Sequence, residues 1–226
     1  MHRALPRLKE SGIQGLMSRD SKPQRNPRPD PRTVSKEILR FWFTEPRDWD
    51  ERMALWFGGA PETDEQIRRR FEPWVGQAAE GRLSAWEASA ESCLALILLL
   101  DQFTLNIYRD QAKSFELNDL ALPIALRALE RGDDQRVEPV RRVFFYLPLE
   151  HSEDLTIQNR AVALFQRLVD EARPEEAEMM KTFHHFAVLH QEVIARFGRF
   201  PDRNPILGRA STPEEQAYLD AGGPPF

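Results

Sequence analysis

Three groups of polar residues interrupt the apolar pattern of this 226-residue chain, and their side chains are the ones that could do chemistry. The first group is the segment 196–209, which holds four arginines, two glycines, two prolines and no lysine. Glycine and proline restrict a loop to defined turns, and a planar guanidinium binds a carboxylate or another anion bidentately. We therefore expect these arginines to bind buried carboxylates of the same protein or an anionic ligand. The four are Arg196, Arg199, Arg203 and Arg209.

The second group follows the apolar run that ends at Leu100. Asp101 and Gln102 come first, and Asn106 and Arg109 lie further along the same predicted helix. A buried carboxylate costs free energy unless a cation or hydrogen-bond donors pair with it, and Arg109 lies two turns away on roughly the same side. Asp101 is therefore either part of a structural ion pair or a carboxylate that faces a ligand.

The third group is the segment Glu-His-Ser-Glu-Asp at 150–154. We expect Ser152 to cap a helix whose first turn holds Glu153 and Asp154, because carboxylates there stabilise the helix dipole. This role leaves Glu150 and His151 unexplained. A histidine just before a helix N-terminus has its charged form disfavoured, which suits a neutral acceptor or a metal ligand. A structural, hydrogen-bonded histidine is the alternative.

His190 lies on the apolar face of a predicted helix over 174–197, together with positions 179, 183, 186, 193 and 197. It is either a core histidine or a functional one. The neighbouring His184 and His185 have no ligand-type partner at i,i+4, and no His-Glu-x-x-His motif occurs. The single cysteine, Cys93, excludes a cysteine-rich zinc site. We predict no metal and no cofactor.

Helical signals position these groups. From about Ser35 onward the chain reads as helices with short connections, and no segment alternates like a strand over six residues. The sequence predicts an all-α fold of about eight helices, with a single domain over 34–226 after a disordered, basic, proline-rich tail over 1–33. Helix starts are expected at the capping box Thr63-Asp-Glu-Gln66, after Ser89, at Pro174 and at the capping box Thr212-Pro-Glu-Glu215. One helix is expected over 115–131, interrupted by Pro123 and ended by Gly132, and further helix ends are expected at Pro148 and Gly198.

Charge and hydropathy limit the partners. The net charge is −5, and residues 1–32 carry eight Lys/Arg against three Asp/Glu, so the remainder is near −10. An acidic body argues against nucleic acid as a partner. The longest apolar run, 93–100, is eight residues, too short to span a membrane. We predict a soluble, cytoplasmic protein that binds no nucleic acid and no membrane. The arginines of the tail leave an organellar targeting role open.

Several motifs, in this order, resemble the bacterial domain of unknown function 924 family over roughly 36–220. The resemblance implies helical hairpins in a tetratricopeptide-like, right-handed array, and it implies no settled biochemical activity. The motifs are Phe41-Trp-Phe43, Leu98-Leu-Leu-Asp-Gln-Phe103, Asn106-Ile-Tyr-Arg109, Leu147-Pro-Leu-Glu-His-Ser-Glu-Asp154, Phe197-Gly-Arg-Phe-Pro-Asp-Arg-Asn204, Leu207-Gly-Arg209 and Ser211-Thr-Pro-Glu-Glu215.

The resemblance also marks polar positions and two departures. Thr104 and Leu105 stand where the family usually has Pro-Arg, and Asp202 stands where it usually has histidine. Both changes reduce local positive charge, so this member would bind an anion more weakly or bind another ligand. The marked positions are Asp101, Gln102, Asn106, Arg109, His151, Glu153, Asp154, His190, Arg196, Arg199, Arg203, Asn204 and Arg209.

Three hypotheses about function follow. In the first, the protein binds a small anionic molecule or a peptide carboxylate in a groove. In the second, it is an enzyme of the hydrolase or lyase type with His151 or His190 as general base, oriented by an acid. In the third, the polar groups form a purely structural arginine–carboxylate network. The candidate catalytic residues are Asp101, His151 and His190. The candidate ligand-binding residues are Asp101, Gln102, Asn106, Arg109, Glu150, His151, Asp154, Arg196, Arg199, Arg203 and Asn204.

Overall fold

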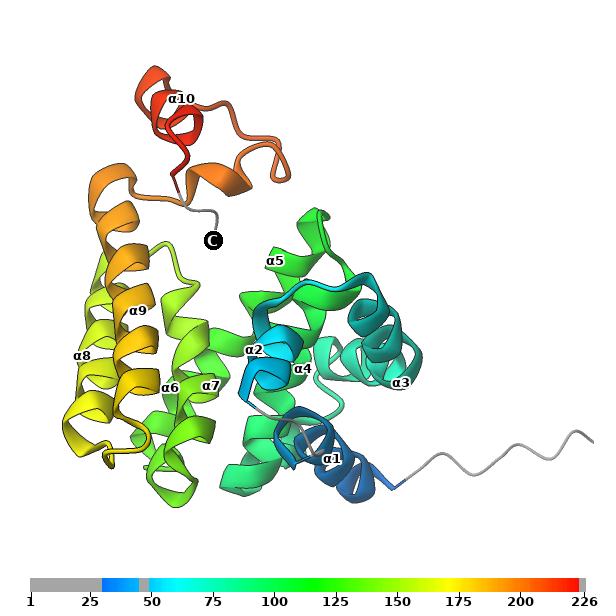
Figure 1. Cartoon of the computed structure of the whole chain (residues 1–226). Coiled ribbons are helices and arrows are strands. Elements are labelled where there is room, and N and C mark those ends of the chain that lie inside the picture. The colour runs from blue at the N-terminus through cyan, green and yellow to red at the C-terminus, as the bar shows by residue number, and fades with distance from the viewer. Residues whose placement is uncertain (1–29, 45–48, 224–226) are drawn as a thin grey trace, which may run out of the picture.

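The computed structural model describes residues 30–44 and 49–223, and the regular elements in these ranges are all helical (Figure 1). The all-α prediction is confirmed. The first elements are α1 (Pro31–Leu39), η1 (Arg40–Thr44), α2 (Trp49–Phe57), α3 (Pro61–Ala79), η2 (Ser84–Ala88), α4 (Ala90–Ile107) and α5 (Ala112–Asn118). The remainder are α6 (Ala121–Glu130), η3 (Asp134–Arg136), α7 (Pro139–Glu150), α8 (Leu155–Glu171), α9 (Ala177–Phe197), η4 (Pro201–Arg203) and α10 (Pro213–Asp220).

Helix α4 is the centre of the core. It contacts α1, α3, α5, α6 and α7, and each side chain from Leu94 to Leu100 is at most 2% exposed. Neighbours on every side explain why this helix is apolar on every face. By length and hydropathy α4 could also cross a membrane, but 83% of it is buried inside the protein, as in the core helix of a soluble fold.

Consecutive helices pack as hairpins around this centre. Short connections at 151–154 and 172–176 join α7 to α8 and α8 to α9, and both pairs are in contact. Figure 1 shows α8 and α9 side by side on one flank, α1 to α3 on the other, and α10 at one end beyond α9. A right-handed, tetratricopeptide-like order of these hairpins stays a prediction.

Aromatic side chains fill the core between α1, α3, α4 and α7. The Phe103 ring lies 5.2 Å from Trp42 and 4.9 Å from Phe71, and Trp42 lies 5.9 Å from Phe144. A second, small apolar cluster of Val193, Ile194 and Phe200, with Phe197 and Tyr218 against it, lies at the end of α9. This second cluster anchors the C-terminal segment.

The first helix begins earlier than predicted. Asp30 caps α1 by accepting a hydrogen bond of 2.9 Å from the Arg32 backbone N–H, and Pro31 occupies the first turn, where proline is favoured. Residues 31–33, predicted as tail, are therefore helical. The remainder of the predicted tail, 1–29, lies outside the described residues.

Other predicted boundaries shift for identifiable reasons. Helix α3 begins at Pro61, ahead of the predicted capping box at Thr63. Helix α7 continues through Pro148 to Glu150, because a proline this close to the end removes one hydrogen bond without stopping the last turn. Asp154 caps α8 in place of Ser152, with its carboxylate 2.7 and 3.1 Å from two backbone nitrogens.

The segment 115–131 is divided between α5 and α6, but the break comes after Asn118, and Pro123, the expected interruption, lies in the first turn of α6. The long helix α9 begins at Ala177, not at Pro174. Three predicted helix boundaries were correct. Gly132 and Gly198 take left-handed conformations, with φ of +69° and +70°, at the ends of α6 and α9. Thr212 and Glu215 form the predicted capping box of α10.

Candidate functional site

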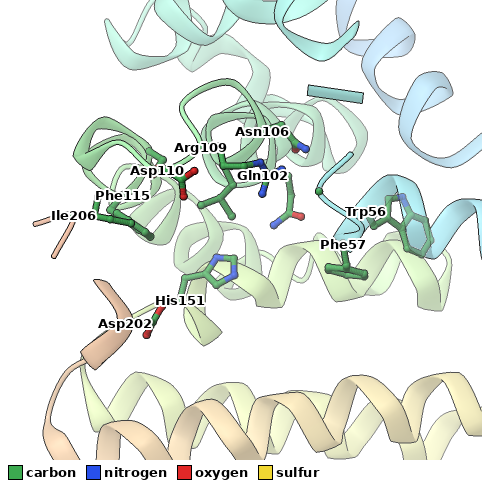
Figure 2. A pocket seen from close by; sticks show the side chains of 13 residues that line it. Trp56, Phe57, Gln102, Asn106, Arg109, Asp110, Phe115, His151, Asp202 and Ile206 are labelled. Carbon is green, nitrogen blue, oxygen red and sulfur yellow. The ribbon is translucent and has the colours of Figure 1, made fainter. Parts of the chain in front are cut away.

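A cleft of about 620 Å³ lies where α2, α4, α5, the end of α7 and the loop after α9 approach one another (Figure 2). Its lining combines apolar and aromatic side chains with amides, carboxylates, an arginine and a histidine. The lining residues are Trp56, Phe57, Gly59, Gln102, Leu105, Asn106, Arg109, Asp110, Ser114, Phe115, His151, Asp202 and Ile206. Four predicted site residues, Gln102, Asn106, Arg109 and His151, are therefore brought together here.

Asp101 and His151 form a hydrogen-bonded pair in the wall of the cleft. His151 Nδ1 lies 2.8 Å from Asp101 Oδ1, and the Gln102 side-chain amide donates to Asp101 Oδ2 at 2.6 Å. Asp101 is fully buried, whereas the side chain of His151 keeps 14% exposure and lines the cleft. Because a carboxylate accepts, Nδ1 carries the proton in this contact and Nε2 is left as the second ring nitrogen.

The hydrogen bond between Asp101 and His151 corrects two predictions, one about each residue. Asp101 does not pair with Arg109, although Arg109 is much nearer in sequence; its partner is 50 residues away. His151 is the C-cap of α7 and does not directly precede α8, so the argument from the dipole of the following helix does not apply.

A second carboxylate, Asp64, holds two of the polar side chains that line the cleft, Asn106 and Arg109. Arg109 donates to it through Nε at 2.7 Å and Nη2 at 2.9 Å, and the Asn106 amide donates to it at 2.8 Å. Burial raises the pKa of Asp64, but these hydrogen bonds outweigh burial and hold it below its usual value. Sequence reasoning missed Asp64, because an acid in the first turn of a helix already has an ordinary explanation.

Glu150 and His190 form a second pair behind the first, outside the lining of the cleft. His190 Nδ1 lies 3.2 Å from Glu150 Oε1 and 2.8 Å from the Phe186 carbonyl, and the rings of His151 and His190 are 6.3 Å apart. Burial, with the charge of Asp101, raises the pKa of Glu150 to about 8. Burial also lowers the pKa of His190 to about 3. Glu150 and His190 therefore lie outside the cleft lining, and a ligand-binding role for Glu150 and a catalytic role for His190 stay predictions.

Three of the four loop arginines bind carboxylates of the protein itself. Arg196 contacts Glu214 at 3.0 Å, and Arg199 grips Glu215 at 2.6 and 2.8 Å. The Arg199 hydrogen bond lowers the pKa of Glu215 to about 2. Arg209 holds both oxygens of Glu153 at 2.7 and 3.0 Å.

The fourth arginine and the neighbouring asparagine are buried under the loop. The Arg203 guanidinium lies 4.2 Å from the centre of the Phe200 ring and donates to the His151 carbonyl at 3.1 Å. Asn204 is fully buried and donates to Ser211 at 3.1 Å. Arg203 thereby supports the backbone that carries the cleft histidine.

The loop and one helix cap contribute none of their predicted ligand-binding side chains to the cleft. Carboxylates, aromatic rings or backbone groups of the protein contact these side chains instead. The residues are Asp154, Arg196, Arg199, Arg203 and Asn204, and ligand binding by them stays a prediction. Both departures from the family pattern, Leu105 and Asp202, do line the cleft, as do Trp56, Phe57 and Asp110, which no sequence signal singled out.

In the described part of the chain, no group of three or more histidine, cysteine, aspartate or glutamate side chains has the arrangement of a metal site. The cleft instead holds a histidine that is hydrogen-bonded to a buried carboxylate, which is the geometry by which proteins prepare a general base.

Comparison with known proteins sets this site in a family context. No curated protein matches the chain. A solved structure of a protein of unknown function from Agrobacterium tumefaciens is similar, with 39% identity and a TM-score of 0.74, over 85% of this chain and 100% of that one. The family model described as bacterial protein of unknown function (DUF924) matches residues 38–223. The chain therefore belongs to the bacterial DUF924 family.

Proposed function

We propose that the protein is an enzyme of the hydrolase or lyase type that binds a small molecule in the cleft and uses His151 as a general base. One observation carries this proposal: the hydrogen bond of 2.8 Å between the fully buried Asp101 and His151, which lines the cleft. Asp101 keeps the proton on Nδ1, so Nε2 can take a proton from a bound reactant. The buried carboxylate then stabilises the imidazolium that forms.

We propose that the base acts on water or directly on the substrate, and not on a thiol, amine or hydroxyl group of the protein. Among the described lining residues there is neither cysteine nor lysine. Ser114 is 2% exposed, and its hydroxyl donates to the Gln111 carbonyl at 2.8 Å. Activated water gives a hydrolase and proton abstraction from the substrate gives a lyase.

Arg109 is the group best placed to stabilise negative charge that develops during the reaction. Asp64 occupies its Nε and Nη2, and within the described residues no hydrogen bond occupies Nη1. Gly59 makes room for the guanidinium: its φ is +63°, and an added Cβ would lie 3.3 Å from Nη1. A larger residue at 59 would therefore strain the backbone and crowd this group.

A binding protein without catalysis is the second candidate, and the same Nη1 favours it. A guanidinium edge in a cleft can pair with a small anion or with the carboxylate of a peptide. We further propose that the protein works in the cytoplasm, on the basis of its acidic body and of Cys93, a buried thiol whose pKa burial raises to about 12. A concave, tetratricopeptide-like scaffold stays part of the proposal.

Turnover by matched histidine variants tests the general base. We would compare the turnover rates of the wild type, His151→Gln and the control His185→Gln, which changes an exposed histidine on α9. The substrates are a panel of chromogenic esters, amides, phosphoesters and glycosides, together with lyase substrates. We expect His151→Gln to lose about 10²–10⁴ of the wild-type rate and His185→Gln to lose none. Equal rates in all three proteins, or no turnover by the wild type on any class, would contradict the proposal.

A further inference from the structure

We infer that the ligand of this cleft carries a protonated amine and an apolar body, because the cleft presents an excess of hydrogen-bond acceptors and negative charge. The inference rests on the proposed function for the identity of the site, and it specifies the class of molecule that the site takes. It departs from the anionic ligand that the arginine-rich loop suggested, since three of those arginines pair with carboxylates of the protein and none of the four lines the cleft.

Two buried amides on α4 form the acceptor floor. Gln102 and Asn106 lie one helical turn apart, are 5% and 6% exposed, and both line the cleft. Each donates its NH₂ group to a carboxylate, Gln102 to Asp101 at 2.6 Å and Asn106 to Asp64 at 2.8 Å. A carboxylate only accepts, so these contacts fix the amide orientation and leave each carbonyl oxygen on the other side.

These two oxygens lack donors within the described residues. Neither Gln102 Oε1 nor Asn106 Oδ1 accepts a hydrogen bond from any described residue, and neither oxygen is fully buried, although the two residues are only 5% and 6% exposed. Both oxygens are therefore open to the cleft and can accept hydrogen bonds from a ligand or from water. His151 Nε2 adds a third acceptor, since the contact with Asp101 places the ring proton on Nδ1.

The charged residues that line the cleft also favour an ammonium group. Its one cationic side chain among the described lining residues, Arg109, is already paired bidentately with Asp64. Two further carboxylates, Asp110 and Asp202, line the cleft, although Asp202 also interacts with the cation of Arg203, and Asp101 lies behind His151. An ammonium group gains from Asp110 and from the acceptors, whereas an anion gains only the open edge of Arg109.

Apolar side chains in the lining suit an apolar body. Phe57, which is 48% exposed, Leu105 and Ile206 all line the cleft without any polar group. Figure 2 shows His151, Gln102 and Asp110 around the same space, with Phe57 across from Asp110 and Ile206 at the Asp110 end. A molecule with an ammonium group and an apolar chain or ring contacts both kinds of side chain, and the aromatic ring also attracts cations.

Three probes of one shape and different charge test the inference. Titration calorimetry with the full chain compares 3-phenylpropylamine, 3-phenylpropan-1-ol and 3-phenylpropionate. We expect the amine to bind about tenfold or more tighter than the alcohol and the propionate to bind most weakly. Asp110→Asn removes most of the advantage of the amine, whereas Asp170→Asn, on the exposed face of α8, leaves it unchanged.

Binding of the propionate as tight as that of the amine, absence of amine binding, or an unaltered preference in Asp110→Asn would each overturn the inference. The outcome is separate from that of the general-base proposal. A propionate preference combined with loss of turnover in His151→Gln would refute the amine and keep the base. An amine preference combined with unchanged turnover in His151→Gln would do the reverse.

Discussion

At the scale of single residues, the site depends on how two neighbouring buried acids are paired. Asp101 is hydrogen-bonded to His151 and Gln102, and Glu150, one residue before His151, faces His190. Burial and the charge of Asp101 keep Glu150 protonated at pH 7, with a pKa of about 8. His151, the proposed general base, therefore lies next to one charged carboxylate and not two.

This arrangement predicts an alkaline loss of stability. The native protein holds the Glu150 proton up to about pH 8, whereas the unfolded chain releases it near 4.5. The native state therefore binds more protons in that interval, and the free energy of unfolding falls as the pH rises. His190 acts in the opposite direction, between its folded pKa of about 3 and its ordinary 6.5, so the fall is clearest above 6.5. We expect a net loss of about 1 kcal/mol from pH 6.5 to 8.

Urea denaturation of the wild type and of Glu150→Gln at pH 6.5 and 8 measures this effect. The variant has no proton to lose at this position, so its free energy of unfolding should change less over the interval. Glu178→Gln, a change at an exposed acid on α9, should keep the wild-type dependence. A wild-type slope in Glu150→Gln would mean that Glu150 is already ionised at pH 6.5.

At the scale of elements, the loop between α9 and α10 is a brace for the cleft. Arg209 ties the loop to Glu153 at the start of α8, and Arg199 ties it to Glu215 in the capping box of α10. Between these ties, Arg203 donates to the His151 carbonyl and Asp202 lines the cleft. The loop thus positions cleft residues without contributing an arginine to the cleft itself.

We predict that Glu153→Gln loosens this brace without unfolding the protein. The change removes the charge that holds Arg209 and weakens the acceptor of the Phe200 backbone N–H, which donates to Glu153 at 2.9 Å. Hydrogen–deuterium exchange should rise in segment 199–209 and stay unchanged in α4. Glu171→Gln breaks a comparable pair with Arg142 on α7 and α8 and serves as the control. Equal exchange in 199–209 for all three proteins would refute the bracing role.

At the scale of the whole molecule, α4 both builds the core and carries the polar floor of the cleft. Its leucine-rich first half is enclosed by five helices, and its second half presents Gln102 and Asn106. Leu98 is fully buried, so Leu98→Ala should lower the free energy of unfolding by about 2–5 kcal/mol. Leu120→Ala, at a side chain 40% exposed, should cost far less. Similar denaturation midpoints for both variants would contradict a core centred on α4.

The local features of this fold could be predicted from the sequence, and the long-range pairings could not. A leucine run apolar on every face predicted the central helix, and Thr212 predicted the start of α10. The partners of Asp101 and Arg109 lie 50 and 45 residues away, so only the packing of helices brings them together. Glu153 had a sufficient local explanation as a helix-dipole acid, which concealed its role as the partner of Arg209.

The tautomer of His151 tests the central claim most directly, because it requires no substrate. A long-range proton–nitrogen NMR spectrum of the histidine rings at neutral pH, assigned with His151→Gln, locates the proton on this ring. The account predicts a proton on Nδ1, held by Asp101, and a bare Nε2 facing the cleft. A proton on Nε2 would leave the cleft without its base and would contradict the account.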